Sequence, residues 1–371
     1  MLIFVLFKGV EIPGYHLVYF LFLSAVLVAT AIFYTPFKFA VHFEINSLIK
    51  EYIKLAVVFL YFLIGYNLIN RKIIHLSIKC YSYTALFVGI LGILISVLGL
   101  KFMFQLYDFG VDRFNGFMND PNYFAIVQIS ALPFFLRAEK ISLKSKIIIY
   151  SIILTSILLS GSKTGIITLI LYTFMFIFGD IFKKRLKVKT VLSIIITIVT
   201  LALLILFFGK NFSSLIENKV QFQRISLIFT DFNAAFNNGG SSRLPIWNAG
   251  FKLISLSPFV GVGVGMYSPV SEKVSGIDAV AHNTYIQTYS EWGGIFATTF
   301  FLYLTSILLK VTFSKKLNNG INPMLRDILI ILLIGSIAVS FNNARMFWFF
   351  LGALVYSTSS KHQVKASNNI S

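Results

Sequence analysis

Long hydrophobic runs, separated by short polar loops, extend over most of the chain. A transmembrane helix needs about 20 mostly apolar residues, and ten stretches approach this length. The ten predicted spans are residues 15–35, 51–70, 80–100, 121–137, 146–161, 164–182, 190–208, 284–309, 325–341 and 344–359. The motif Gly161-Ser162-Lys163-Thr164 divides one longer apolar stretch and predicts a tight turn between two short helices. The pattern predicts an all-α polytopic membrane protein.

Composition supports this class. Of the 371 residues, 57% are hydrophobic and only 12% are charged, and the mean hydropathy is +0.82. Soluble domains carry about 25% charged residues, so a soluble globular enzyme is excluded. The single cysteine, Cys80, excludes an internal disulfide and any metal cluster that is held by several cysteines.

The net charge of +18 does not indicate a nucleic-acid partner, because the basic residues lie in short loops between apolar runs. Under the ten-span topology every basic cluster falls on one side, which the positive-inside rule makes cytoplasmic, together with both termini. These clusters are Arg71, Lys72 and Lys79; Arg137, Lys140, Lys144 and Lys146; Lys183, Lys184, Arg185, Lys187 and Lys189; and Lys310, Lys315, Lys316 and Arg326.

The same topology predicts the domain organisation. Residues 1–208 form transmembrane helices 1–7, residues 209–283 form one large periplasmic or extracellular loop unit with short helices, and residues 284–359 form helices 8–10. Residues 360–371 form a cytoplasmic tail. Since the large loop contains the richest polar motifs, we expect function to face outward.

The polar residues that open the span at 284–309 are the most informative motif. His282 and Asn283 precede the helix, and Asn283, Gln287 and Glu291 recur every four residues, so they share one face. Glu291 lies about 13 Å along the helix from His282. Polar groups at this depth are costly and indicate function. The alternative is structural: His282 is a cap or interface histidine, and Glu291 is a buried acid paired with a base such as Arg345.

Two further outward motifs combine a cation with a predicted helix start. Arg113 lies in an aromatic loop before Asp120-Pro121-Asn122. Asp120 suits a helix cap and Pro121 suits the first helical turn, which leaves Arg113 either solvated or facing a ligand. Lys163 follows the small-residue turn, where it either snorkels to the membrane interface or faces an anion at the positive end of the next helix.

The large loop contributes a third cation at a predicted helix start. Arg243 precedes Pro245 and Trp247 in a sequence that predicts a helix on the membrane surface. A cation at a helix N-terminus opposes the helix dipole, so an anionic partner would explain it. Arg224 lies in the same loop.

The motif Gly261-Val262-Gly263-Val264-Gly265-Met266 follows. It is no dinucleotide fingerprint, because its spacing is wrong and no strand–helix unit surrounds it. We predict a flexible turn that returns the chain toward His282.

In this order, the motifs resemble the O-antigen ligase/O-antigen polymerase superfamily of bacterial membrane glycosyltransferases. The resemblance covers about residues 80 to 310. It rests on Arg113…Gly116…Pro121-Asn122…Ala125, Ser162-Lys163, Arg243-x-x-x-Trp247, Gly261-x-Gly263-x-Gly265 and His282-Asn283 followed after nine residues by Gly293. The family often has arginine where this chain has Lys163. Ligases often have a small residue where this chain has Phe296, which favours a polymerase.

The resemblance implies a C-type glycosyltransferase fold in the bacterial cytoplasmic (inner) membrane. The implied donor is an oligosaccharide on undecaprenyl pyrophosphate. The implied acceptor is another lipid-linked glycan for a polymerase of O-antigen or capsular polysaccharide, or lipid A-core or a protein for a ligase. A chain-length regulator and a flippase are possible partners in the cell envelope.

The residues fit this chemistry. Transfer from a pyrophosphate needs charge neutralisation, which arginine provides, and an acceptor for the hydroxyl proton, which histidine provides. We expect His282, Arg243 and Arg113 to be catalytic. The predicted substrate-binding residues are Lys163, Arg224, Asn283, Asn122, Trp247 and Gln287, whereas Glu291 and Arg345 are structural or uncertain. The sequence has no D-x-D pair and no carboxylate cluster with metal-ligand spacing, so we expect no cofactor, metal-independent transfer and inversion at the anomeric carbon.

Two alternatives remain open at this stage. Within the same chemistry the chain is a ligase. In a different class it is a transporter, such as a flippase of lipid-linked oligosaccharides. Transporters tend to show internal repeats and broken helices in both halves, and this sequence shows no repeat.

Overall fold

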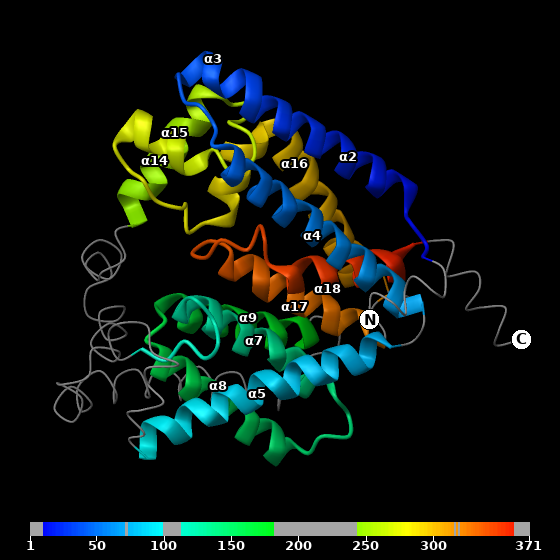
Figure 1. Cartoon of the computed structure of the whole chain (residues 1–371). Coiled ribbons are helices and arrows are strands. Elements are labelled where there is room, and N and C mark those ends of the chain that lie inside the picture. Colours follow the sequence, from blue (N-terminus) through cyan, green and yellow to red (C-terminus); the bar gives the residue numbers. More distant parts are fainter. Residues whose placement is uncertain are drawn as a thin grey trace, which may run out of the picture. The chain divides into compact units, whose positions relative to one another are not determined.

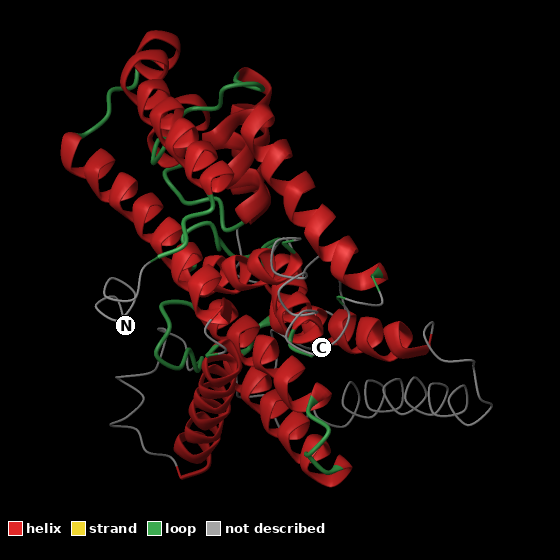
Figure 2. Cartoon of the chain, turned by 90° about the vertical axis from the view of Figure 1, so that its right-hand side faces the viewer, coloured by secondary structure: helices red, strands yellow, loops and turns green. Residues whose placement is uncertain are grey.

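The computed structural model describes residues 10–70, 73–98, 113–181, 243–314, 317 and 320–359. Within these ranges the regular elements are all helices and no strand occurs (Figure 2). The predicted span 190–208, the tail 360–371 and Arg224 lie outside the described residues. The chain divides into two compact units, one made of Met1–Cys80 with Arg243–Ser371 and the other of Tyr81–Ser242.

The first unit joins the two ends of the chain. Its N-terminal helices are α2 (Gly14–Ala29), which continues through a π-helical turn (Thr30–Tyr34) into α3 (Thr35–Phe39), and α4 (Ile45–Asn70). Its C-terminal helices are α14 (Arg243–Leu256), α15 (Tyr267–Ser275), α16 (Thr284–Phe313), α17 (Asn322–Gly335) and α18 (Arg345–Thr358) (Figure 1).

The second unit contains most of α5 (Ile74–Leu98), with α7 (Pro121–Arg137), α8 (Leu143–Ser160) and α9 (Lys163–Ile181). Helix α7 packs against both α8 and α9. The buried amide of Gln128 on α7 donates to the carbonyl of Ala85 on α5 at 2.7 Å. This bond fastens α5 to α7, and Gly89 leaves the space that the Gln128 side chain occupies.

These helices confirm that the chain is a helical membrane protein. Each predicted span within the described residues overlaps a helix, although the span predicted at 325–341 ends as a helix at Gly335. Four described helical segments are long and apolar enough to cross a membrane: Gly14–Phe39, Ile74–Leu98, Leu143–Ser160 and Thr284–Phe313. The ten-span topology and the predicted domain boundaries stay predictions.

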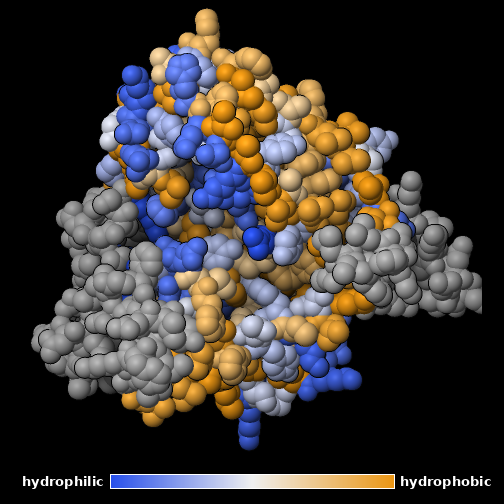
Figure 3. Space-filling model, in the orientation of Figure 1, coloured by the Kyte–Doolittle hydropathy of each residue, from blue (hydrophilic) through white to orange (hydrophobic). Residues whose placement is uncertain are grey.

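Large apolar side chains on the outside of the first unit fit a lipid environment. Tyr15, Val18, Phe22, Phe33 and Phe37 are all more than half exposed along α2 and α3. Figure 3 shows hydrophobic side chains along α2, with hydrophilic ones gathered over α14 and α15. In water this surface would be unfavourable, whereas acyl chains cover it without cost.

Small residues let α4 and α18 approach closely. A Cβ on Gly65 would lie 1.9 Å from the carbonyl oxygen of Phe349, and a Cβ on Gly352 would lie 2.0 Å from that of Phe62. Each helix therefore contributes a glycine at the point where the backbone of the other passes, as is common for packed membrane helices.

Candidate functional site

The start of α16 places His282 and Asn283. Asn283 is the N-cap residue, and its side-chain oxygen accepts a hydrogen bond from the backbone N–H of Ile286 at 3.0 Å. His282, directly before it, has φ +47°, which few residues other than glycine adopt. Such strain persists only where the surrounding structure holds it, and it is typical of functional sites.

Thr284 holds this strained turn in place. Its backbone N–H donates to the carbonyl of Ser336 at 2.8 Å. Its hydroxyl donates to the carbonyl of Val339 at 2.8 Å and accepts from the N–H of Phe341 at 2.7 Å. The chain between α17 and α18 thus binds the first residue of α16, so the half-buried imidazole of His282 projects from a fixed backbone.

Helix α16 is broken at Gly293, whose φ is +74° and ψ is +167°. The break separates an N-terminal half (residues 284–292) from a C-terminal half (residues 294–313). A break inside a membrane helix frees backbone groups that must find other partners. The freed groups here include the carbonyls of Ser290 and Glu291 and the N–H of Gly294.

Residues 258–265, here called the glycine segment, supply those partners. Val262 N–H donates to Ser290 O at 2.8 Å, Gly263 N–H donates to Glu291 O at 3.0 Å, and Gly294 N–H donates to Pro258 O at 2.7 Å. The predicted turn is present, but residues 261–264 are buried and the segment is tied to α16 by hydrogen bonds, so it is a fixed part of the packing.

The alternating glycines of this segment have a physical reason. Gly261, Gly263 and Gly265 all have φ between +72° and +85°, a region that glycine tolerates and other residues avoid. A Cβ on Gly261 would lie 2.5 Å from Glu291 O, and one on Gly263 would lie 2.5 Å from Ala31 N, within the π-helical turn that follows α2. The Thr35 hydroxyl also binds the segment, because it donates a hydrogen bond to the backbone carbonyl of Val262 at 2.6 Å.

Gln287 and Glu291 face this segment from the N-terminal half of α16. Glu291 is only 6% exposed, and its Oε1 lies 3.3 Å from Nε2 of Gln287, which donates to it. The backbone of Gly265 also donates to the carboxylate. No ion pair joins Glu291 to Arg345: Arg345 is exposed, and its guanidinium carbon lies 5.8 Å from the ring centroid of Tyr61.

Helix α14 places Arg243 and Trp247. It packs on α16 at Gly250, where a Cβ would lie 2.2 Å from the side chain of Ile286. Arg243 is the first residue of α14 and is half-buried. Trp247 packs against the hydrophobic cluster between α14, α15 and α16, and within the described residues its indole N–H has no hydrogen-bond partner.

Tyr267, at the start of α15, completes this packing. Its hydroxyl donates to Ile246 O at 3.1 Å. Burial raises the pKa of Tyr267 to about 12, and the nearby carboxylate of Glu291 acts in the same direction. The hydroxyl therefore stays a hydrogen-bond donor at neutral pH.

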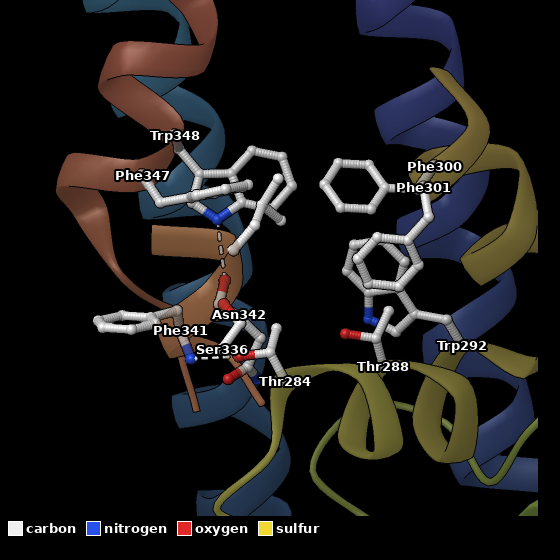
Figure 4. A pocket seen from close by; sticks show the side chains of 11 residues that line it. Thr284, Thr288, Trp292, Phe300, Phe301, Ser336, Phe341, Asn342, Phe347 and Trp348 are labelled. Carbon is white, nitrogen blue, oxygen red and sulfur yellow. Dashed lines mark hydrogen bonds between the residues drawn. The ribbon is translucent and has the colours of Figure 1, made fainter. Parts of the chain in front are cut away.

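An aromatic pocket lies beside the N-terminal half of α16 (Figure 4). Its polar wall groups include Thr284, Thr288, Ser336 and Asn342. The hydroxyls of Thr284 and Ser336 and the carbonyl of Asn342 already make hydrogen bonds within the protein. The remaining lining is apolar: Trp292, Phe300, Phe301, Leu333, Phe341, Phe347 and Trp348. The free volume of the pocket is only about 10 Å³, which is close to the space that one water molecule needs, so the rings that line it pack closely.

The second unit brings Arg113, Asn122 and Lys163 to one place, around the turn between α8 and α9. Arg113 is 7% exposed and its Nε donates to Ser160 O at 2.9 Å, at the C-terminus of α8. Asn122 Oδ1 accepts from the hydroxyl of Ser162 at 2.8 Å. Lys163 opens α9 directly after Ser162. Arg113 therefore caps the C-terminus of α8, where the negative end of the helix dipole favours a cation.

The local sequence explains this arrangement. Asp120 is the N-cap of α7, as predicted, and accepts from the N–H groups of Asn122 and Tyr123. Gly161 takes φ +59° to end α8, and Ser162 accepts from Gly165 N–H at 3.0 Å to begin α9. The predicted tight turn between two short helices is confirmed.

Sequence reasoning missed the bonds of Thr284, the aromatic pocket and the bonds between the glycine segment and α16. Gly293 carried a signal, since Gly293 and Gly294 are adjacent, and two glycines in succession inside a span favour a break because each lowers helix propensity. The partners of the break lie about 30 residues earlier, at a place that no local pattern indicates.

Comparison with protein families gives one match. Residues 148–302 match the family described as O-Antigen ligase. The matched segment contains Lys163, Arg243, the glycine segment and the stretch from His282 to Gly293, and leaves out Arg113 and Asn122. No curated protein and no solved structure matched the chain. Over this segment the chain is similar to the O-antigen ligase family, which supports the resemblance to the O-antigen polymerase/ligase superfamily that its motifs predict.

Proposed function

We propose that the chain is a polymerase that joins undecaprenyl-pyrophosphate-linked oligosaccharide repeat units into O-antigen or capsular polysaccharide at the outer face of the cytoplasmic membrane. The family match supports a membrane glycosyltransferase of the ligase/polymerase type. The observation that carries the assignment is His282, held with φ +47° at the start of a broken membrane helix inside the matched segment.

The proposed reaction is a direct displacement. The acceptor hydroxyl oxygen bonds to the anomeric carbon of the donor, the bond from that carbon to the pyrophosphate oxygen breaks, and His282 takes the hydroxyl proton. The leaving group is polyprenyl pyrophosphate, which carries the bonding electrons away. Arg243 and Arg113 neutralise its charge, with Lys163 and Arg224 in support.

Three of the predicted residues receive narrower roles. Asn283 acts through the backbone, since its side chain caps α16. Gln287 donates to Glu291, which supports a structural role for this side chain beside its predicted contact with substrate. Trp247 packs into the core of its unit, where its ring supports α14.

One observation favours a ligase as the second candidate, because the matched family carries that description. Phe296, the residue that favours a polymerase in the sequence, packs against Tyr19 and Phe22 of α2. It therefore fills space between helices, and its contacts fit either activity.

Purified protein in detergent, supplied with undecaprenyl-pyrophosphate-linked repeat units alone, tests the proposal. We expect a ladder of longer lipid-linked glycans. Product that forms only after lipid A-core or an acceptor protein is added would establish the ligase. The control is His42→Ala, because His42 is an exposed histidine in the loop between α3 and α4.

A further inference from the structure

Glu291 is a buried acid with no assigned role in the transfer reaction. It lies on the N-terminal half of α16, two residues before the break at Gly293. Burial of a carboxyl group in an apolar region costs free energy unless hydrogen bonds offset it. The position therefore requires an explanation from its contacts.

Those contacts connect two separate stretches of chain. The carboxylate accepts from the side chain of Gln287, one turn earlier on α16. It also accepts from the backbone of Gly265, at the end of the glycine segment. The backbone carbonyl of the same residue accepts from Gly263 N–H at 3.0 Å. One residue thus binds the glycine segment through both its side chain and its backbone.

The groups around Glu291 show that it does not simply pair with a base. The charges of Glu51 and Lys54 on α4 act on Glu291, and these two residues form an ion pair with each other at 2.5 Å. The charge of Glu291 also raises the pKa of Tyr267 on α15. The Lys54 ammonium is therefore already engaged, and the closest partners of Glu291 are neutral N–H donors.

The contacts at the break in α16 also determine the position of His282. The N-terminal half of α16 has lost the helical hydrogen bonds that would continue it beyond Gly293, so it is held at that end by the glycine segment. His282 and Asn283 are at its other end. Any slip of this half-helix along the segment would move the imidazole, and a shift of about 1 Å in a reacting group can cost about 100-fold in rate.

We propose that Glu291 is a positioning residue, which locks the N-terminal half of α16 to the glycine segment and so fixes His282 for proton transfer. This role rests on the proposed function. The requirement is a hydrogen-bond acceptor of the right shape, and the negative charge is dispensable.

Two substitutions separate shape from charge. Glu291→Gln keeps an acceptor oxygen for Gly265 N–H, and its amide group can donate to the Gln287 oxygen after that side chain turns over. Glu291→Ala removes every side-chain contact. We expect Glu291→Ala to lower kcat about 10- to 100-fold with KM for the lipid-linked donor within about threefold of wild type. Glu291→Gln should keep kcat within about threefold. The control is Glu51→Gln, which alters the neighbouring acid on α4 and should act like wild type.

Amide hydrogen exchange of the full chain in detergent gives a readout that does not depend on activity. We expect at least about tenfold faster exchange across residues 258–265 and 284–292 in Glu291→Ala, because opening exposes those N–H groups. Glu291→Gln and Glu51→Gln should exchange like wild type.

Either of two results would overturn the role. Glu291→Gln as inactive as Glu291→Ala would show that the charge itself is needed. Loss of activity in Glu291→Ala with unchanged exchange would show that Glu291 acts directly on substrate. If the wild-type protein forms no glycan with any acceptor, the proposed function fails, while the exchange comparison still decides whether Glu291 locks the segment.

Discussion

Replacing Gly293 by alanine tests whether the break in α16 holds the site together. Gly293 has φ +74° and ψ +167°, a region that only glycine adopts readily, and another residue there costs about 1–3 kcal/mol. In addition, the new Cβ would lie 2.2 Å from the carbonyl oxygen of Phe259. Real Cβ contacts are essentially never closer than 3.0 Å, so the glycine segment must move by about 0.8 Å.

That movement stretches the bonds between the glycine segment and α16. The bonds Val262 N–H to Ser290 O and Gly294 N–H to Pro258 O are 2.8 and 2.7 Å long. Each hydrogen bond contributes about 0.5–1.5 kcal/mol. With the backbone strain, the free energy of unfolding should fall by about 2–6 kcal/mol, which for a chain of this length corresponds to a Tm lower by about 3–8 °C. Glycan synthesis should fall about 100-fold, because the half-helix that carries His282 shifts.

Thermal unfolding in detergent and the repeat-unit assay measure these effects. Gly179→Ala on α9 is the matched control, because no heavy atom lies within 4 Å of its new Cβ and its φ is not positive. Alanine favours a helix over glycine by about 1 kcal/mol, so this control should keep or slightly raise the Tm. A Gly293→Ala protein with the wild-type Tm and activity would refute the reasoning.

Three further outcomes are expected. His282→Ala and Arg243→Ala should each abolish glycan synthesis with normal membrane insertion; wild-type glycan length in either variant would remove that residue from the reaction. EDTA should leave the activity intact, and a loss that a divalent metal restores would contradict metal-independent transfer. Asp120→Ala should lower stability by about 1 kcal/mol, seen as a lower Tm, because two N–H groups of α7 lose their acceptor.

The sequence alone determined the class of protein and the positions of most helices. Apolar runs of about 20 residues have few alternatives to a helix in a membrane, because every backbone N–H and C=O needs an internal partner. Helix ends could also be predicted where capping residues mark them, as at Asp120 before α7 and at Gly161 between α8 and α9. The order of the motifs also identified the superfamily, because it needs only residue types and spacing.

Tertiary structure decided what the polar residues do. Sequence placed Asn283, Gln287 and Glu291 on one helix face, and only packing showed that Asn283 caps the helix while the other two meet each other and Gly265. The predicted pairing of Glu291 with Arg345 is wrong, because packing buries Glu291 and leaves Arg345 exposed beside Tyr61.

The glycine segment shows most clearly what a local sequence pattern cannot predict. Three alternating glycines indicate freedom of the backbone when only neighbours along the chain are considered. In the folded unit, this freedom permits positive φ angles and close contact with Glu291 and with the π-helical turn that follows α2. Hydrogen bonds between residues 258–265 and 290–294 depend on where a distant helix breaks. A local pattern predicts the elements, whereas only three-dimensional contact decides which freed backbone groups find each other.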